Sequence, residues 1–181
     1  MINDLLKDAD HKMDQAVVHT RQEFGGIRSG RANPGLLSRI TVDYYGTQTP
    51  LQQIAGFTVP EARLLVIQPY DKTAIPAIER AIQEADLGLN PSNDGNVIRL
   101  AFPSLTEERR KELIRLVRHI AEDGRISIRN VRRHCKDRLE SEDVSEDDIR
   151  RAEKVLQVKT DEHIERLDQV LAAKEEELLE V

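Results

Sequence analysis

The chain has 181 residues, so it is long enough to bury a hydrophobic core without covalent cross-links. Its formal net charge is −6. Its single cysteine, Cys135, excludes a disulfide within the chain, and no apolar run approaches the roughly 18 residues of a membrane span. Aromatic residues make up only 3%, which argues against a platform that stacks unpaired bases, and the N-terminus has no signal-peptide pattern, so we expect a cytoplasmic protein.

The first 25 or so residues predict one long amphipathic helix. Apolar side chains recur there at steps of three and four residues, which is the period of a single helix face. The helix is expected to end at Gly25-Gly26 or at Gly30, because Asn33-Pro34-Gly35 cannot continue it.

The segment from Arg31 to Leu105 has the composition of a separate small α/β domain, with β-branched runs, prolines and turn residues. We predict strands at residues 39–45, 64–67 and 97–102, with a turn at Gly46-Thr47 that leads the first of them into a returning segment, Gln48-Thr49-Pro50-Leu51. A helix is expected between Ala74 and Ala85, and a loop over residues 87–95.

Two further helices of roughly 35 residues each are expected after Pro103. The segments 106–108 and 145–148 resemble N-caps, with a hydroxyl first and acids in the first turn. Helices of this length need partners along the whole apolar face, so residues 1–30 and 106–181 are predicted to form a bundle from which residues 31–105 loop out. The predicted fold class is α+β: a long antiparallel three-helix bundle with an inserted small β/α/β domain.

Two connections would join the bundle and the inserted domain. Both contain small or turn-forming residues, and a hinge and a rigid joint remain open at this point. The connections are Ser29-Gly30-Arg31 and Pro103-Ser104-Leu105.

Positive charge is concentrated on the first of the two later helices. Residues 109–138 hold eleven Lys and Arg against four acids, a local charge of +7 that leaves −13 for the rest of the chain. At 100° per residue, eight of these cations fall opposite the apolar stripe. We call this set the basic ridge; its members are Lys111, Arg115, Arg118, Arg125, Arg129, Arg132, Arg133 and Lys136.

The composition of the basic ridge favours an anion-binding surface over an ordinary solvated helix face. Six of its eight members are arginine, whose planar guanidinium binds phosphate bidentately. Only Glu107, Glu122 and Glu140 interleave on this side, so like charges at steps of three and four would repel one another. Because aromatic residues are scarce, duplex or structured RNA fits this surface better than free single strands.

Catalytic signatures are missing from the sequence. It contains no GxxxxGK[ST], GxGxxG, GxSxG or CxxC motif. His134 stands beside Cys135, but successive helical residues point about 100° apart, and Cys135 belongs to the apolar stripe. We therefore interpret Cys135 as a buried structural thiol, and we expect no metal site and no cofactor.

Several motifs resemble those of the ribosome recycling factor family, in the family's order and over nearly the whole chain. They are residues 24–34, 59–63, 87–95 and 105–111, the helix motif Ile128-Arg129-Asn130-Val131-Arg132-Arg133, and residues 174–181.

The resemblance implies an L-shaped protein with the size of a transfer RNA, which binds the post-termination ribosome between its subunits. It implies that elongation factor G and its GTP hydrolysis drive subunit splitting and release from mRNA, so this chain would be no enzyme; we expect it to be a monomer. The bundle would lie on large-subunit ribosomal RNA, with the smaller domain toward the small subunit and the factor. By motif, Arg129, Arg132 and Arg133 are the implied RNA contacts, with Arg28 and Arg31 near the bend as further candidates.

The chain departs from the family at four positions. Small or acidic residues are usual where it has His134 and Cys135, and alanine is commoner at Gly124 and Ser127. Two other functions stay open from the residues alone. One is a coiled-coil adaptor that binds proteins through the acidic last helix, which salt-sensitive binding to large ribosomal subunits would exclude. The other is an enzyme with Cys135 as nucleophile, which full function of Cys135→Ser would exclude.

Overall fold

The computed structural model describes residues 1–180, so Val181, the end of the segment predicted to form the bundle, lies outside the described part. The chain forms two compact units. One consists of Met1–Arg28 and Glu107–Glu180, and the other of Ser29–Thr106. Among residues 1–180, the structure contains no helix with both the length and the apolar character needed to cross a bilayer.

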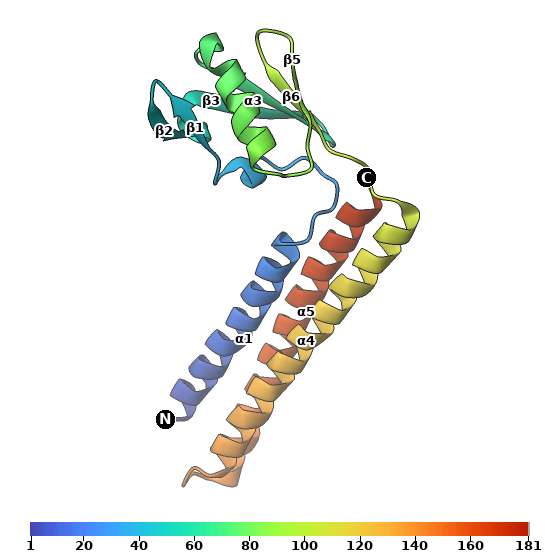
Figure 1. Ribbon diagram of the computed structural model, residues 1–181. Coiled ribbons are helices and arrows are strands. Elements are labelled where there is room, and N and C mark those ends of the chain that lie inside the picture. Colours follow the sequence, from blue (N-terminus) through green and yellow to red (C-terminus); the bar gives the residue numbers. More distant parts are fainter. Residues whose placement is uncertain (181) are drawn as a thin grey trace. The chain divides into compact units, whose positions relative to one another are not determined.

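The first unit is a bundle of the three long helices α1 (Ile2–Gly25), α4 (Glu107–Glu140) and α5 (Glu146–Leu179), each packed against the other two (Figure 1). The ion pairs between α4 and α5 show that the two helices are antiparallel. The earlier residue of α4, Arg118, pairs with the later residue of α5, Glu175, and the later residue Lys136 pairs with the earlier residue Glu153. Ser145 caps α5 as predicted, since its side chain accepts a hydrogen bond from the amide of Asp148.

The apolar stripe predicted for α4 is buried at most of its positions. Leu113, Val117, Ile128 and Leu139 are at most 4% exposed. Leu116 lies at the edge of the stripe and is 44% exposed.

Among the described residues, four polar side chains are buried inside the bundle, and each has a hydrogen-bond partner, as burial requires. Thr20, Thr160 and His163 bond to the carbonyl oxygens of the preceding helical turn. Lys174 reaches from α5 to the carbonyl oxygen of Ile27, at 3.1 Å, just beyond the end of α1. The burial of Lys174 was not predicted, because a lysine normally marks an exposed position.

The second unit contains a four-stranded antiparallel sheet in the order β3-β4-β6-β5 and a separate β1-β2 hairpin. In chain order, its elements are η1 (Pro34–Leu37), β1 (Thr41–Tyr44), β2 (Thr47–Pro50), α2 (Leu51–Ile54), β3 (Ala55–Glu61), β4 (Leu64–Pro69), η2 (Lys72–Ala74), α3 (Ile75–Glu84), β5 (Pro91–Asn93) and β6 (Ile98–Ala101).

The β1-β2 hairpin turns at Tyr45-Gly46, where the φ angles of 51° and 80° are both positive. A two-residue turn with positive φ at both positions matches the twist of the strands it joins, which explains the glycine. Ile78 and Ile82 of α3 are buried in one core with Ile67 of β4 and Leu100 of β6. The predicted combination of β-strands with one packed helix is therefore confirmed.

Two strands were not predicted. Strand β5 lies within residues 87–95, which had been assigned to a loop, and it pairs only with β6 at the edge of the sheet. Strand β3 contains Gly56 and Pro60, which disfavour strand interiors, and its register shifts between Thr58 and Glu61. A β-bulge at an edge strand accommodates such residues. The composition of this segment therefore did not indicate a strand.

Candidate nucleic-acid interface

The basic ridge lies on the surface of α4, opposite the residues that pack into the bundle. Arg125 and Lys136 are half-buried, and the other six members are exposed. The helical period alone was enough to predict this placement, since it depends only on the residue spacing within one long helix.

Three members of the basic ridge are paired with acids of α5. Nε of Arg118 lies 2.6 Å from Glu175, Arg125 bonds to Asp168, and Lys136 lies 3.4 Å from Glu153. The prediction that few acids interleave on this side was therefore incomplete. It considered only the acids of α4 itself, whereas the antiparallel neighbour supplies three more. These pairs offset part of the repulsion expected along the basic ridge.

The three acids of α4 that were predicted on this side also pair with members of the basic ridge. Glu107 lies 3.0 Å from Lys111, and Glu140 lies 3.6 Å from Lys136. Glu122 contacts both Arg125 and Arg129. Five of the eight cations in the basic ridge therefore have an acidic partner.

Arg115, Arg132 and Arg133 have no ion pair within residues 1–180, and all three side chains are exposed. An exposed guanidinium without a carboxylate partner keeps its whole hydrogen-bonding edge available to an external anion. Two of these arginines, Arg132 and Arg133, belong to the helix motif from which RNA contact was inferred. The structure thus brings the motif arginines together on one exposed face of α4.

Arg125 and Arg129 differ in how firmly they are held. Nε and Nη2 of Arg125 both donate to one oxygen of Asp168, at 2.8 and 2.6 Å, and its Nη1 donates to Glu122 at 3.0 Å. Burial lowers the pKa of Arg125, but the bonds to Asp168 and Glu122 outweigh it and raise the pKa overall. Arg129 donates to Glu122 at 3.1 Å and is otherwise exposed.

The remaining candidates for RNA contact lie outside α4. Arg28 ends the first segment of the bundle unit, and Arg31 belongs to the second unit. Both side chains are exposed. Neither arginine belongs to α4, the helix that carries Arg129, Arg132 and Arg133.

The residues proposed as a hinge differ in backbone conformation and in burial. Gly30 has φ of 78°, in the left-handed region that favours glycine, and Ser29 is buried. Pro103 and Ser104 are exposed, whereas Leu105 is half-buried. The first connection therefore contains a position that most other residues would occupy only with strain.

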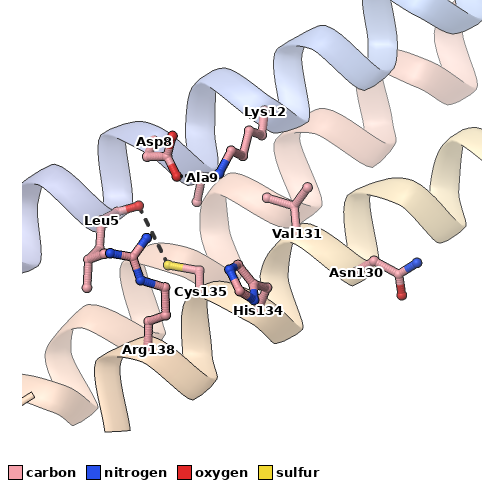
Figure 2. Close-up of a pocket in the computed structure, with 9 residues that line it drawn as sticks. All are labelled: Leu5, Asp8, Ala9, Lys12, Asn130, Val131, His134, Cys135 and Arg138. Carbon is pink, nitrogen blue, oxygen red and sulfur yellow. Dashed lines mark hydrogen bonds and ion pairs between the residues drawn. The ribbon is translucent and has the colours of Figure 1, made fainter. Parts of the chain in front are cut away.

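Cys135 lies beside a shallow depression of about 230 Å³ between α1 and α4 (Figure 2). The residue is 5% exposed, and its Sγ lies 3.7 Å from the carbonyl oxygen of Leu5, as the dashed line marks. Burial raises the pKa of Cys135, so the thiol stays protonated and is a poor nucleophile at neutral pH. No hydrogen bond joins Cys135 to His134 within the described chain, which favours the interpretation as a structural thiol.

The histidines and acids of residues 1–180 form no group of three or more that would hold a metal ion. His163 is buried against α1, where its ring lies 3.6 Å from Asp10 and donates from Nδ1 to the carbonyl oxygen of Lys159. Its contacts are those of a side chain that packs two helices together.

Comparison with known proteins identifies the family. The family model described as Ribosome recycling factor matches residues 20–179. The ribosome-recycling factors of Rubrobacter xylanophilus and Acidothermus cellulolyticus are 57% and 55% identical; the first match covers 97% of both chains and the second covers 100% of both.

Solved structures agree with this assignment. A solution structure of a ribosome recycling factor has a TM-score of 0.75 at 44% identity and covers 99% of this chain and 98% of its own. A second structure has a TM-score of 0.64 at 45% identity and covers 99% of both chains. It describes the T. thermophilus ribosome recycling factor and the E. coli elongation factor G bound to the E. coli post-termination complex. The chain belongs to the ribosome recycling factor family.

Proposed function

We propose that this chain binds the post-termination ribosome in the bacterial cytoplasm and, with elongation factor G and GTP, separates the subunits and releases the ribosome from mRNA. The family membership supports this function, as does the structural relative described with elongation factor G on a post-termination complex. Family members act as translation factors without a catalytic centre of their own, so GTP hydrolysis belongs to the partner.

The observation that carries the RNA-binding part of the proposal is the exposed row of arginines on α4. Arg132 and Arg133 have no acidic partner within residues 1–180, and Arg129 is held by a single carboxylate oxygen. Leaving like charges side by side costs stability, so an external anion is the partner that this arrangement fits. We propose that Arg129, Arg132 and Arg133 contact phosphates of large-subunit ribosomal RNA.

The other members of the basic ridge are assigned different roles. Arg115 is exposed and unpaired in the described chain, so it extends the contact row toward the start of α4. Arg118, Arg125 and Lys136 are held by acids of α5, which suits them to fastening the two helices together. Arg28 and Arg31 remain candidates for RNA contact, because both are exposed and both belong to a motif that resembles the family.

The engaged acids of α5 also bear on the adaptor alternative. That hypothesis needs the acidic last helix as a free surface for protein partners. Glu153, Asp168 and Glu175 instead pair with cations of α4. Part of the negative charge that would attract a partner is therefore already compensated within the bundle.

For the domain arrangement, we propose that residues 1–30 with 106–181 act as the RNA-binding domain and residues 31–105 as a second functional domain. The two compact units support this division. The connections Ser29-Gly30-Arg31 and Pro103-Ser104-Leu105 would serve as the hinge between them. The left-handed backbone at Gly30 supports a special role for the first connection.

Two measurements on one preparation test the proposed function. Subunit splitting of post-termination ribosomes should require this chain, elongation factor G and GTP together. Affinity for isolated large subunits should fall steeply with salt, because each phosphate contact contributes about 0.7 to 0.9 to the slope of log affinity against log salt. A flat salt response would favour the adaptor hypothesis. Splitting without elongation factor G would contradict the proposal that GTP hydrolysis by this partner drives the reaction.

A further inference from the structure

The carboxylate of Glu122 divides its two oxygens between two arginines of the basic ridge. Oε1 accepts a hydrogen bond from Nη1 of Arg129 at 3.1 Å, and Oε2 accepts one from Nη1 of Arg125 at 3.0 Å. An acid in this position competes with any phosphate that approaches Arg129. The hydrogen bonds of the two arginines show which of them can exchange the acid for a phosphate.

Arg125 is firmly held and Arg129 is not. Arg125 donates two hydrogen bonds to Asp168 in addition to the bond to Glu122, and its side chain is 21% exposed. The side chain of Arg129 is 52% exposed, and within residues 1–180 its one acidic partner is a single oxygen of Glu122. Exposed single-contact pairs contribute little to stability, so the pair between Glu122 and Arg129 is easily exchanged.

A phosphate group is the stronger partner for the Arg129 side chain. It presents several oxygens and accepts two parallel hydrogen bonds from one guanidinium, whereas Glu122 accepts only one from Arg129. When Arg129 leaves, Glu122 keeps Arg125 through Oε2. The exchange therefore leaves no acid on this side of α4 without a counter-ion.

On the basis of the proposed RNA-binding function, we propose that Glu122 holds Arg129 in a displaceable resting pair, and that Arg129 transfers to a phosphate of bound RNA while Arg125 stays paired with Glu122 and Asp168. Arg125 is then a positioning residue, because it neutralises the acid that Arg129 leaves behind. Glu122 sets the affinity below its maximum, which suits a factor that has to leave its RNA after each cycle.

The charge state of the pair is consistent with this exchange. Hydrogen bonds from Arg129 and then from Arg125 lower the pKa of Glu122, so the carboxylate stays ionised at neutral pH and competes with phosphate throughout the physiological range. The competition therefore depends on salt and on RNA rather than on proton uptake near neutral pH.

Affinity measurements on three variants test the proposal, with isolated large ribosomal subunits and a generic A-form RNA duplex as probes. Glu122→Gln removes the competing charge, so binding to both probes should tighten about two- to fivefold at low ionic strength. Arg125→Gln leaves Glu122 without its second partner, so the acid holds Arg129 more strongly and binding should weaken by a similar factor. The double variant E122Q/R125Q should bind about as tightly as Glu122→Gln alone, because Arg125 acts on Arg129 only through the acid that is now gone.

A matched control separates this exchange from a simple change in net charge. Glu112 lies outside the arc of the basic ridge and pairs with Arg109 at 3.0 Å. The double variant R125Q/E112Q has the same net charge as E122Q/R125Q, but it should bind as weakly as Arg125→Gln alone. All variants are first checked for an unchanged helical signal and unfolding midpoint.

The outcomes are distinguishable. Unchanged or weaker binding of Glu122→Gln, in a protein whose wild type binds large subunits, overturns the displaceable pair and leaves the proposed function standing. Equal recovery in R125Q/E112Q and E122Q/R125Q also overturns it, since net charge alone would then explain the rescue. Failure of the wild type to bind large subunits overturns the proposed function itself, and this inference with it.

Discussion

Gly124 of α4 faces Thr20 of α1 so closely that no methyl group fits between them. A Cβ atom placed on Gly124 would lie 2.5 Å from Oγ1 of Thr20 and 2.6 Å from Cδ1 of Leu167 on α5. All three helices of the bundle therefore approach one another at this glycine. A glycine inside a helix costs about 1 kcal/mol relative to alanine, and here the close approach of the helices offsets that cost.

We predict that Gly124→Ala destabilises the bundle although alanine is the better helix former. The added methyl group must push aside Thr20, whose hydroxyl is bonded to the carbonyl oxygen of Ala16, and the expected loss is about 1 to 3 kcal/mol. Chemical denaturation of both proteins measures it. A gain in stability would show that the helices can separate at this point without cost.

A double-mutant cycle with Thr20→Ala sharpens this test. Removing the hydroxyl clears the nearer of the two obstructing atoms, while Leu167 can move by a rotation of its side chain. The pair G124A/T20A should therefore be more stable than the sum of the single changes predicts. Strict additivity would mean that the two residues do not obstruct each other.

Arg132→Ala should weaken binding to large ribosomal subunits while leaving the protein equally stable. The side chain is exposed and has no ion pair within residues 1–180, so its loss should change the free energy of unfolding by no more than about 0.5 kcal/mol. A charge-assisted contact with phosphate is worth about 1.5 to 3 kcal/mol, so affinity should fall roughly ten- to hundredfold. Arg150→Ala, an exposed change on α5, is the matched control, and full affinity of a folded Arg132→Ala protein would remove Arg132 from the interface.

The helical period allowed the basic ridge to be predicted, but not the partners of its members. Which of these cations are paired across the helices depends on Glu153, Asp168 and Glu175, and these acids come into register only when α5 packs antiparallel to α4. Within one helix the distance between residues follows from their spacing, whereas between helices it depends on the packing. The sequence alone therefore could not predict that Arg125 is paired with an acid of α5 and that Arg132 is not.

In the small domain, some strands could be predicted from residue preferences and others could not. The turn at Gly46 and the strand after Asn96 follow from local residue preferences, and both were predicted. Strand β5, with only three residues from Pro91 to Asn93, exists because β6 offers it a partner. Its composition is that of a loop, so residue preferences did not indicate that it pairs with β6 across residues 94–97.

Asp94 should make the stability of the second unit depend on pH in the acid range. Hydrogen bonds from the amides of Val97 and Asn96, and then the contact with Arg99, lower the pKa of Asp94 to about 2. Its pKa is lower in the folded chain than the ordinary 3.8, so the stabilisation is present above about pH 4 and is lost as the pH falls toward 2. Denaturation between pH 2 and 6 should show a steeper acid loss for the wild type than for Asp94→Asn.

Cys135→Ser should retain full activity in subunit splitting. The thiol is buried and protonated, and it serves packing between α1 and α4 rather than chemistry. The hydroxyl is more polar than the thiol, so a modest loss of thermal stability is expected. A folded variant that binds large subunits but has lost splitting would revive the enzyme alternative.

Gly30→Pro should uncouple RNA binding from subunit splitting, if the proposed hinge serves function. Gly30 has φ of 78°, whereas proline fixes φ near −65° and lacks an amide hydrogen, so the first connection cannot keep its present backbone path. The bundle core and the arginines of α4 lie elsewhere, so affinity for large subunits through Arg129, Arg132 and Arg133 should survive. GTP-dependent splitting with elongation factor G, measured on the same preparation, should fall.

The control for this prediction is Gly88→Pro, which changes a glycine of similar φ, 70°, outside both connections. It imposes the same backbone restriction within the second unit, so it reports what local strain alone does to splitting. Small-angle scattering then decides whether Gly30→Pro has narrowed the range of domain angles. Normal splitting by a variant that holds one fixed angle would mean that the connection is only a joint, because motion would then be dispensable for the reaction.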